Sequence, residues 1–211
     1  ADRSAAEGPF IVGYASGSHT HEADLAVALP AVERFLRANP DAEFHCIGRM
    51  DQPEALRALF GERVRYRKAV PWPDLPGELA RFSVQIVPLA DVPFNRCKSH
   101  IRFVEAAAVG VPSVVSAVGE PGTSVFNGVT GLVCGNDPDA WVAALQTLHD
   151  DDVMRQRLGD AARQFALHHL TTASPFLAAR ARHILGDLEL GFLRDKLSIV
   201  IAGHEPAGIA A

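Results

Sequence analysis

The stretch KSHIRFVEAAAVGVPSVVS, residues 98–116, contains the repeating unit that decides the fold. Its apolar residues recur at helical spacing up to Gly110, a residue type common just past the end of a helix. The spacing predicts a helix from Lys98 or Ser99 to residue 109, followed at once by a short apolar strand over 112–118. A helix that leads directly into a buried strand is the building unit of parallel α/β sheets.

The same alternation of short apolar strands and amphipathic helices continues on both sides of this stretch. Further strands are expected at 10–15, 43–48, 64–69, 84–89 and 131–134, and helices at 21–37, 53–60, 75–82, 137–148, 152–169 and 174–193. Strands that are mostly apolar along their length indicate a parallel sheet covered on both faces. We therefore predict a doubly wound, Rossmann-like α/β fold: a parallel six-stranded sheet with helices on both faces, whose ligands bind beyond the carboxyl ends of the strands.

The predicted domain spans residues 1–170 and is followed by a helical C-terminal extension over 171–195. Residues 196–211 are expected to form a tail that is either disordered or the start of a further module. The chain begins at Ala1 without an initiator methionine and without the apolar run of a signal peptide. We therefore expect a fragment of a longer protein.

The composition is that of an ordinary globular protein and excludes several classes of function. The 20 Lys and Arg residues against 25 Asp and Glu residues leave a net charge of −5, so we expect no nucleic-acid binding. Cys46, Cys97 and Cys134 are widely separated, which excludes a disulfide framework and favours a reducing, cytoplasmic compartment. No apolar run reaches the roughly 18 residues that a membrane-spanning helix needs.

The loop after the first strand combines small residues, Gly13, Gly17 and Ser18, with the start of a helix. Backbone N–H groups and a helix N-terminus at such a place favour a phosphate, and the alternative is a merely tight turn. The glycines do not follow the dinucleotide fingerprint. In addition, the second strand ends in Gly48 and Arg49 rather than in an acidic residue that would bind a ribose.

Two histidines in the same loop, His19 and His21, could bind a metal only together with further ligands. The remaining histidines are scattered along the chain, so we expect no metal site. One of the two imidazoles could instead donate a hydrogen bond to a phosphate or a sugar. The alternative for this segment is a structural one, in which Thr20 caps the following helix.

Lys98, Arg102 and Glu105 are spaced to share one stripe of the predicted helix. Charged stripes are often only solvated faces, and that alternative stays open. This stripe, however, starts at the carboxyl end of a strand, and Glu105 is followed by three alanines that allow close packing. A carboxylate there can accept hydrogen bonds from two ribose hydroxyls, while Lys98 can supply positive charge for a diphosphate.

The run from Lys98 through Glu105 to Ser116 resembles the nucleotide-sugar signature of GT-B glycosyltransferases. More narrowly, it is similar to the group-1 family of retaining enzymes, where a helix Glu precedes an Ala-rich turn, a Gly-x-Pro-x-Val segment and a strand. The run Asn-Gly-Val-Thr-Gly-Leu-Val, residues 127–133, is similar to a hairpin of the same family. The resemblance covers approximately residues 10–170.

The resemblance implies roles for individual residues of a donor site. Glu105 matches the family glutamate that binds the ribose hydroxyls of the donor nucleotide. Lys98 and Ser99 precede that glutamate, where contacts to the donor phosphate and sugar are made. The resemblance further implies that Gly17 and Ser18 face the diphosphate and that Val70 and Pro71 hold the base through backbone contacts. Because the usual Arg/Lys pair of the family is absent, Arg102 and His21 are expected to supply positive charge together with Lys98.

Several departures from the family pattern indicate a divergent member. Many members carry a second Glu eight positions before the first, and this chain has Cys97 there. The Arg/Lys pair that usually follows the first strand is replaced by Ser-Gly-Ser-His-Thr-His at 16–21. Thr123 and Ser124 occupy the place of a further downstream Glu. These departures leave the transferred sugar and the full activity open.

The function implied by the resemblance is the nucleotide-diphosphate-sugar-binding, C-terminal half of a glycosyltransferase that transfers a hexosyl group to an unknown acceptor. No cofactor and no metal are expected, since positive side chains and a helix N-terminus can stabilise the leaving diphosphate. The expected partners are a nucleotide sugar and an N-terminal acceptor-binding domain outside this chain, while peripheral membrane association of the full-length enzyme stays open. The alternatives are half of a nucleotide-sugar epimerase, a catalytically degenerate interaction domain, and a dinucleotide-dependent oxidoreductase.

Overall fold

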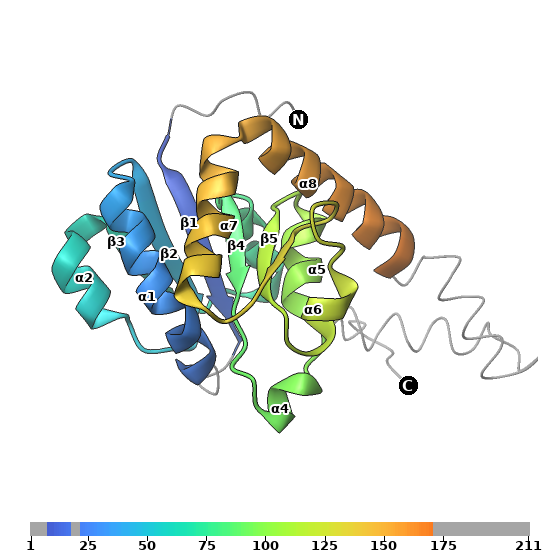
Figure 1. The fold of residues 1–211 in the computed structure, drawn as a ribbon, viewed down its shortest axis with the longest axis horizontal. Helices are drawn as coiled ribbons and strands as arrows, with labels where there is room; N and C mark the ends of the chain where they lie inside the picture. The colour runs from blue at the N-terminus through green and yellow to red at the C-terminus, as the bar shows by residue number, and fades with distance from the viewer. Residues whose placement is uncertain (1–7, 18–21, 171–211) are drawn as a thin grey trace, which may run out of the picture. The chain divides into compact units, whose positions relative to one another are not determined.

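A parallel sheet forms the centre of the computed structural model, which describes residues 8–17 and 22–170 (Figure 1). The strand order is β3-β2-β1-β4-β5-β6, and neighbouring strands pair in parallel. The strands are β1 Phe10–Ser16, β2 Ala42–Gly48, β3 Val64–Lys68, β4 Val84–Val87, β5 Ser113–Ser116 and β6 Leu132–Cys134. The predicted six-stranded parallel sheet is therefore confirmed.

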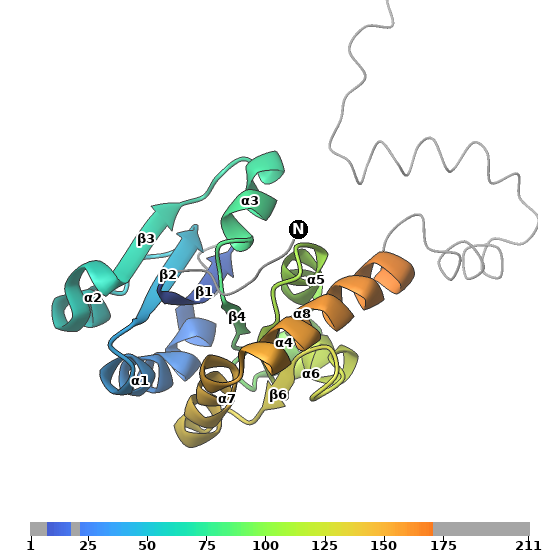
Figure 2. The same cartoon turned by 90° about the horizontal axis from the view of Figure 1, so that it is seen from above.

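Helices cover both faces of this sheet, as predicted. They are α1 Glu22–Ala38, α2 Glu54–Phe60, α3 Leu75–Leu79, α4 Pro93–Arg96, α5 Ile101–Ala108, α6 Gly119–Ser124, α7 Pro138–Asp150 and α8 Asp152–Phe165. Short 3-10 turns over Gly61–Arg63 (η2) and Trp72–Asp74 (η3) precede β3 and α3. Seen from above, α1 and α7 lie on one side of the sheet, and α3 and α5 lie on the other (Figure 2).

Apolar side chains fill the space between the sheet and the helices on each face. The larger group packs α1 and α7 against the strands and contains the fully buried Phe35, Phe44 and Trp141. A smaller group on the other face includes Leu79 of α3 and Ala106 of α5. Each large apolar side chain that is buried in this way contributes about 1.5–3 kcal/mol, so the two groups hold the helices against the two faces of the sheet.

The strand order reverses between β1 and β4, which are neighbours in the sheet although two strands separate them in the sequence. The helices that follow these two strands lie on opposite faces, so the loops at their carboxyl ends diverge and leave a crevice. Gly48 is the last residue of β2, at the same carboxyl-terminal edge of the sheet, and it has a φ of 130°. A Cβ atom at Gly48 would overlap the backbone of Ser16, so a glycine allows the ends of β1 and β2 to approach each other.

Two short helices lie in segments for which the sequence predicted neither a helix nor a strand. α4 follows the predicted strand 84–89, and α6 follows the predicted strand 112–118. Proline stands in the first turn of α4, and α6 contains Pro121 and two glycines. These residue types usually indicate turns, and each helix is too short to show a helical periodicity. Neither helix could therefore be predicted from the sequence pattern.

The helix expected to begin at Lys98 or Ser99 begins only at Ile101, so the prediction that Lys98 lies on its charged stripe is wrong. The 127–133 run, expected as a hairpin, forms a turn in which the Gly128 N–H donates to the Gly131 carbonyl over 2.8 Å. The strand that follows this turn, β6, pairs in parallel with β5 and has no antiparallel partner in the described sheet.

The chain divides into two compact units after Phe165. The described part of the second unit is a short π-helix, Ala166–Leu170. The predicted helical extension 171–195 and the tail 196–211 lie outside the described residues. The predicted domain limits therefore stay predictions.

Candidate functional site

A cavity of about 450 Å³ lies at the carboxyl ends of the first three strands, next to α5. It is lined by Ala15, Ser16 and Gly17 at the end of β1, Ile47, Gly48 and Arg49 at the end of β2, Ala69, Val70, Trp72 and Leu75 after β3, and Ile101, Arg102 and Glu105 on α5. This is the edge of a doubly wound sheet at which ligands bind, and the volume is typical of a small-molecule site.

Four residues that the sequence analysis singled out line this one cavity. They are Gly17 at the end of β1, Val70 after β3, and Arg102 and Glu105 on α5. These residues are far apart in the sequence, since Glu105 lies 88 residues after Gly17 (105 − 17). Only the fold brings them together, and their assigned roles toward a ligand stay predictions.

The other candidate residues are placed differently. Pro71 is exposed and lies between two lining residues without being one of them. Lys98 and Ser99 precede α5 and are not among the residues that line the cavity. Ser18 and His21 lie outside the described residues.

Glu105 presents a partly buried carboxylate to the cavity. Burial raises the pKa of this carboxyl above its ordinary value, while the nearby guanidinium of Arg102 acts in the opposite direction. The two side chains are three residues apart on α5, so they lie on one side of the helix. A carboxylate that has lost part of its water shell gains most from a ligand that donates hydrogen bonds to it.

Arg102 is held in place by residues of the two central strands. Its guanidinium lies 5.4 Å from the centre of the Tyr14 ring, and its Nη1 donates to the Tyr14 hydroxyl over 3.3 Å. Its backbone carbonyl accepts a hydrogen bond from Gln85 Nε2 over 2.9 Å. The second terminal nitrogen, Nη2, is buried and has no hydrogen-bond partner among the described residues. Arg102 therefore brings a fixed positive charge to the wall of the cavity.

Lys98 is engaged in an ion pair that the sequence analysis did not foresee. Its Nζ lies 2.6 Å from Oδ2 of Asp24, a carboxylate in the first turn of α1 that is 2% exposed. The other oxygen of Asp24 accepts hydrogen bonds from Asn95 Nδ2 at 2.5 Å and from the backbone N–H of Ala90 at 3.0 Å. Asp24 thus fixes the β4–α5 loop to the start of α1 across the reversal of the sheet, and it balances the charge of Lys98.

Three functional candidates were missed by the sequence analysis. Asp24 carries no local signal, because its partners are 66 to 74 positions away. Arg49 is an exposed cation on the cavity wall, and its place directly after the second strand could have drawn attention to it. Trp72 lines the cavity and is 63% exposed. Its position between two prolines could have indicated a tryptophan in a surface turn.

Metal and membrane features are absent from the part of the chain that the structure describes. In residues 8–17 and 22–170, no three His, Cys, Asp or Glu side chains are grouped so that they could hold a metal ion. No helix in the same residues combines the length and the apolar character needed to cross a membrane. Cys46, Cys97 and Cys134 are free thiols.

The fold is shared with solved glycosyltransferase structures. HepE from Anabaena, solved in complex with UDP, superposes with a TM-score of 0.67 and 16% identity over 86% of this chain and 50% of that protein. The C-terminal domain of the group 1 glycosyl transferase LpcC from Francisella tularensis gives a TM-score of 0.63 and 12% identity, and covers 78% of this chain and 88% of that domain. At this identity the likeness shows the fold, which is the Rossmann-like domain of GT-B glycosyltransferases.

The sequence itself shows the family. The family profile of "Glycosyl transferases group 1" matches residues 9–151, which is more than half of the chain. The chain therefore belongs to the group 1 glycosyl transferases, as the resemblance implied.

Two curated relatives give the scale of the similarity. The D-inositol 3-phosphate glycosyltransferase of Corynebacterium diphtheriae is 32% identical over 173 residues, which covers 76% of this chain and 39% of that enzyme. The glycogen synthase of Mycobacterium tuberculosis is 30% identical over 156 residues, which covers 70% of this chain and 36% of that enzyme. The chain thus spans less than two fifths of the length of these relatives.

Proposed function

We propose that this chain is the nucleoside-diphosphate-sugar-binding half of a glycosyltransferase. The observation that carries the proposal is the single cavity lined by Gly17, Val70, Arg102 and Glu105. A small-residue loop, a fixed cation and a carboxylate around one cavity suit a ligand with a phosphate group and a hydroxylated sugar. HepE, whose fold is similar, was solved with UDP and with UDP-glucose, which supports a nucleotide sugar as the ligand.

Each wall of the cavity has a proposed role. The Glu105 carboxylate accepts hydrogen bonds from two ribose hydroxyls, which replace the water that burial removes from it. Gly17 lets the backbone approach the diphosphate, and Arg102 supplies positive charge to it. The segment after β3, with Val70 in the wall, contacts the base.

The proposed reaction is the transfer of a hexosyl group from the nucleotide sugar to an acceptor. The bond between the sugar and the diphosphate breaks, and a new bond forms between the sugar and the oxygen of an acceptor hydroxyl, which gives up its proton. The nucleoside diphosphate leaves with additional negative charge. Arg102 and Arg49, both in the cavity wall, stabilise that charge electrostatically and without a metal ion. The acceptor would bind against a second domain of the full-length enzyme.

A calorimetric panel tests the proposal. UDP-glucose, GDP-mannose, ADP-glucose and NAD would each be titrated into the protein under identical conditions. We expect at least one nucleotide sugar to bind and NAD to give no heat. Binding of NAD without binding of any nucleotide sugar would overturn the proposal and favour a dinucleotide-dependent oxidoreductase.

A second candidate is a domain that binds a nucleotide sugar without taking part in transfer, such as a degenerate interaction domain or an epimerase half. It is favoured by the pairing of Lys98 with Asp24 and by Cys97, which is exposed and not among the cavity residues. Release of UDP by the full-length protein separates the two candidates. Acceptor-dependent release supports a transferase, and tight donor binding without any release supports the second candidate.

A further inference from the structure

Trp72 is an exposed aromatic side chain inside the cavity wall. Its indole is 63% exposed, whereas Trp141, the other tryptophan of the chain, is 0% exposed. A tryptophan buries a large apolar area when it finds a partner surface, so leaving it in water sacrifices a large stabilisation. An aromatic ring that stays exposed in a cavity is typical of a ring that meets a ligand.

The backbone around Trp72 is rigid. Pro71 and Pro73 flank it, and each proline fixes its own φ angle. The Asp74 N–H donates to the Pro71 carbonyl over 2.9 Å, which closes the 3-10 turn η3. The indole is therefore presented by a preorganised turn, which lowers the conformational entropy that binding would remove.

The charged and the purely apolar parts of the cavity lining come from different segments. The segment after β3 contributes only apolar residues, Ala69, Val70, Trp72 and Leu75. The charged residues Arg102, Glu105 and Arg49 come from α5 and the end of β2, which also contribute Ile101, Ile47 and Gly48. A nucleotide has a flat aromatic base at one end and a hydroxylated sugar and phosphates at the other. If the ribose lies at Glu105 and the phosphates near the cations, the segment after β3 offers the base an apolar surface.

From this arrangement, and on the basis of the proposed function, we propose that Trp72 is the stacking platform for the base of the nucleoside diphosphate. Stacking of a base on an aromatic ring contributes enough to change affinity about 10- to 100-fold, and every base has a face that can stack. Stacking on Trp72 therefore makes a base necessary for tight binding. It does not distinguish one base from another. Selection among bases is left to the backbone groups around Val70.

The position of the two tryptophans supplies a direct optical test. UDP is added to the protein while tryptophan emission is recorded, and affinities are measured by calorimetry for UDP and for inorganic pyrophosphate. The variants are Trp72→Ala, Trp72→Phe and a matched control, Phe126→Ala. Phe126 is also an exposed aromatic residue, at 52%, but it packs on Phe165 and is not among the cavity residues.

We expect UDP to quench the emission of the unmodified protein and to have almost no effect on the emission of Trp72→Phe. Trp72→Ala should bind UDP about 10- to 100-fold more weakly, Trp72→Phe within about threefold of the unmodified protein, and Phe126→Ala with unchanged affinity. Pyrophosphate has no base, so its affinity should be the same in all four proteins.

The results distinguish this inference from the function on which it rests. If UDP binds by calorimetry but Trp72→Ala binds it equally well, or no quenching occurs, the stacking role is refuted and the nucleotide site stands. If the unmodified protein binds neither UDP nor any nucleotide sugar, the proposed function and the stacking role are both refuted. A loss of pyrophosphate affinity in Trp72→Ala would also refute stacking, because it would indicate a structural effect.

Discussion

The buried carboxylate of Asp24 lies 2.6 Å from the ammonium group of Lys98, although the two residues are 74 positions apart. Asp24 belongs to the first turn of α1, which follows β1, and Lys98 belongs to the loop after β4. β1 and β4 are the neighbouring strands at which the sheet order reverses. The ion pair therefore connects the first turn of α1 with the loop that leads into α5, the helix that carries Arg102 and Glu105.

Asp24→Asn should lower the free energy of unfolding by about 3 kcal/mol, because it leaves a largely buried ammonium group without its counter-charge. Urea unfolding followed by circular dichroism measures this loss. Glu33→Gln is the matched control, since Glu33 forms a more exposed pair with Arg37 and should change stability by less than about 0.5 kcal/mol. Addition of Lys98→Met to Asp24→Asn should recover part of the loss, and strictly additive losses would contradict a direct pair.

Glu105→Gln should make the fold more stable at pH 7. Burial raises the pKa of Glu105 in the folded chain above the value of 4.5 that it has in the unfolded chain. The ionised carboxylate therefore destabilises the fold at pH values above the raised pKa, and this destabilisation is absent below pH 4.5. The urea midpoints of the two proteins should converge as the pH falls through this window. A less stable variant at pH 7 would mean that contacts within the chain, such as that with Arg102, outweigh burial.

Ligand affinity should show the opposite dependence on the charge of Glu105. As the pH falls through the raised pKa, the carboxyl group gains a proton and loses its capacity to accept two ribose hydroxyls. The affinity for UDP should then fall by up to about tenfold per pH unit in the unmodified protein. Calorimetry between pH 4.5 and 8 measures this slope, and Glu105→Gln should remove it. If the affinity of Glu105→Gln for UDP still fell with pH in the same way, another group would be responsible for the pH dependence.

Two helical glycines should respond to alanine in opposite directions. Gly159 lies in α8, where a Cβ atom would overlap the backbone of Gly110, whereas a Cβ atom at Gly77 in α3 has open space around it. Glycine inside a helix is less favourable than alanine by about 0.5–1 kcal/mol, so Gly77→Ala should stabilise the protein by up to that amount. Gly159→Ala should destabilise it by about 1–3 kcal/mol, since backbone must move to make room. Thermal unfolding of the two variants measures both changes in stability. If Gly159→Ala stabilised the protein, the close packing of α8 against Gly110 would be contradicted.

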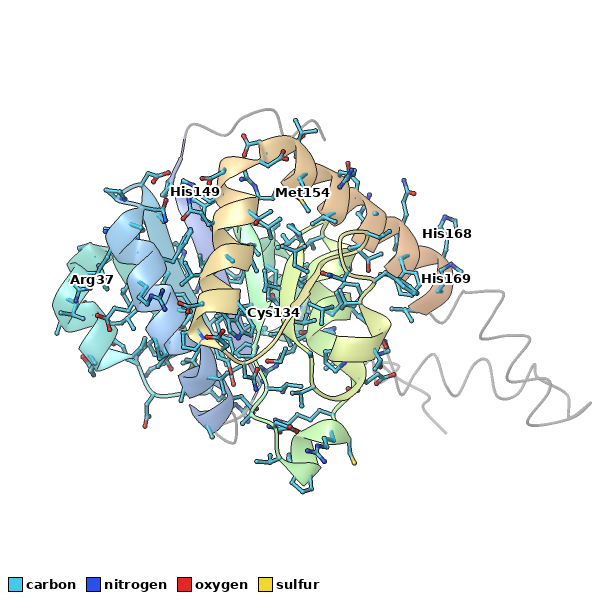
Figure 3. The ribbon with its side chains drawn as sticks, in the orientation of Figure 1. Arg37, Cys134, His149, Met154, His168 and His169 are labelled. Carbon is cyan, nitrogen blue, oxygen red and sulfur yellow. The ribbon has the colours of Figure 1, made fainter. Side chains whose placement is uncertain are left out.

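His149, near the end of α7, should add stability at mildly acidic pH (Figure 3). Burial tends to lower its pKa, but hydrogen bonds with Asp150 at 2.9 Å and Asp41 at 3.1 Å raise the pKa above 6.5 overall. The stabilisation is therefore complete below pH 6.5 and is lost as the pH rises through the raised pKa.

His149→Gln should remove this pH dependence. Both carboxylates are exposed, so the difference amounts to no more than about 1 kcal/mol and shrinks at high salt. Unfolding free energies at pH 5.5 and pH 8 measure it. Equal losses at both pH values would instead reflect the packing of the imidazole against Phe10 and Phe35.

The sheet could be predicted from the sequence because its signals are local. Most strands are short, mainly apolar runs, although β3 (Val64–Lys68) is largely charged, and each long helix shows its periodicity within a few turns. The number of strands and the fold class could therefore be predicted. The short helices α4 and α6 could not be predicted in this way. They are stabilised by their surroundings, such as the close approach of Gly119 to the backbone of Asn95, which has no counterpart in the local sequence.

The part of the candidate site that lies on a single helix could be predicted from the sequence. Arg102 and Glu105 lie on one helix at a spacing that is visible in the sequence, and both reach the cavity. Lys98 was wrongly placed on the same helix, because its partner Asp24 is distant in the sequence and becomes a neighbour only through the fold. Trp72 and Arg49 follow different strands, and only the parallel arrangement of β2 and β3 brings them to one cavity.

Glu105 is the residue that we propose to bind the ribose of a nucleoside diphosphate, and the function of the cavity depends most on this role. Calorimetric titration of UDP into the unmodified protein, into Glu105→Gln and into the control Glu54→Gln tests this directly, since Glu54 is an exposed glutamate on α2. Loss of hydrogen bonds to a charged acceptor should weaken UDP binding about 10- to 100-fold in Glu105→Gln and leave Glu54→Gln unchanged. Equal affinity of all three proteins for UDP would contradict the account and would make the charged stripe of α5 a solvated face.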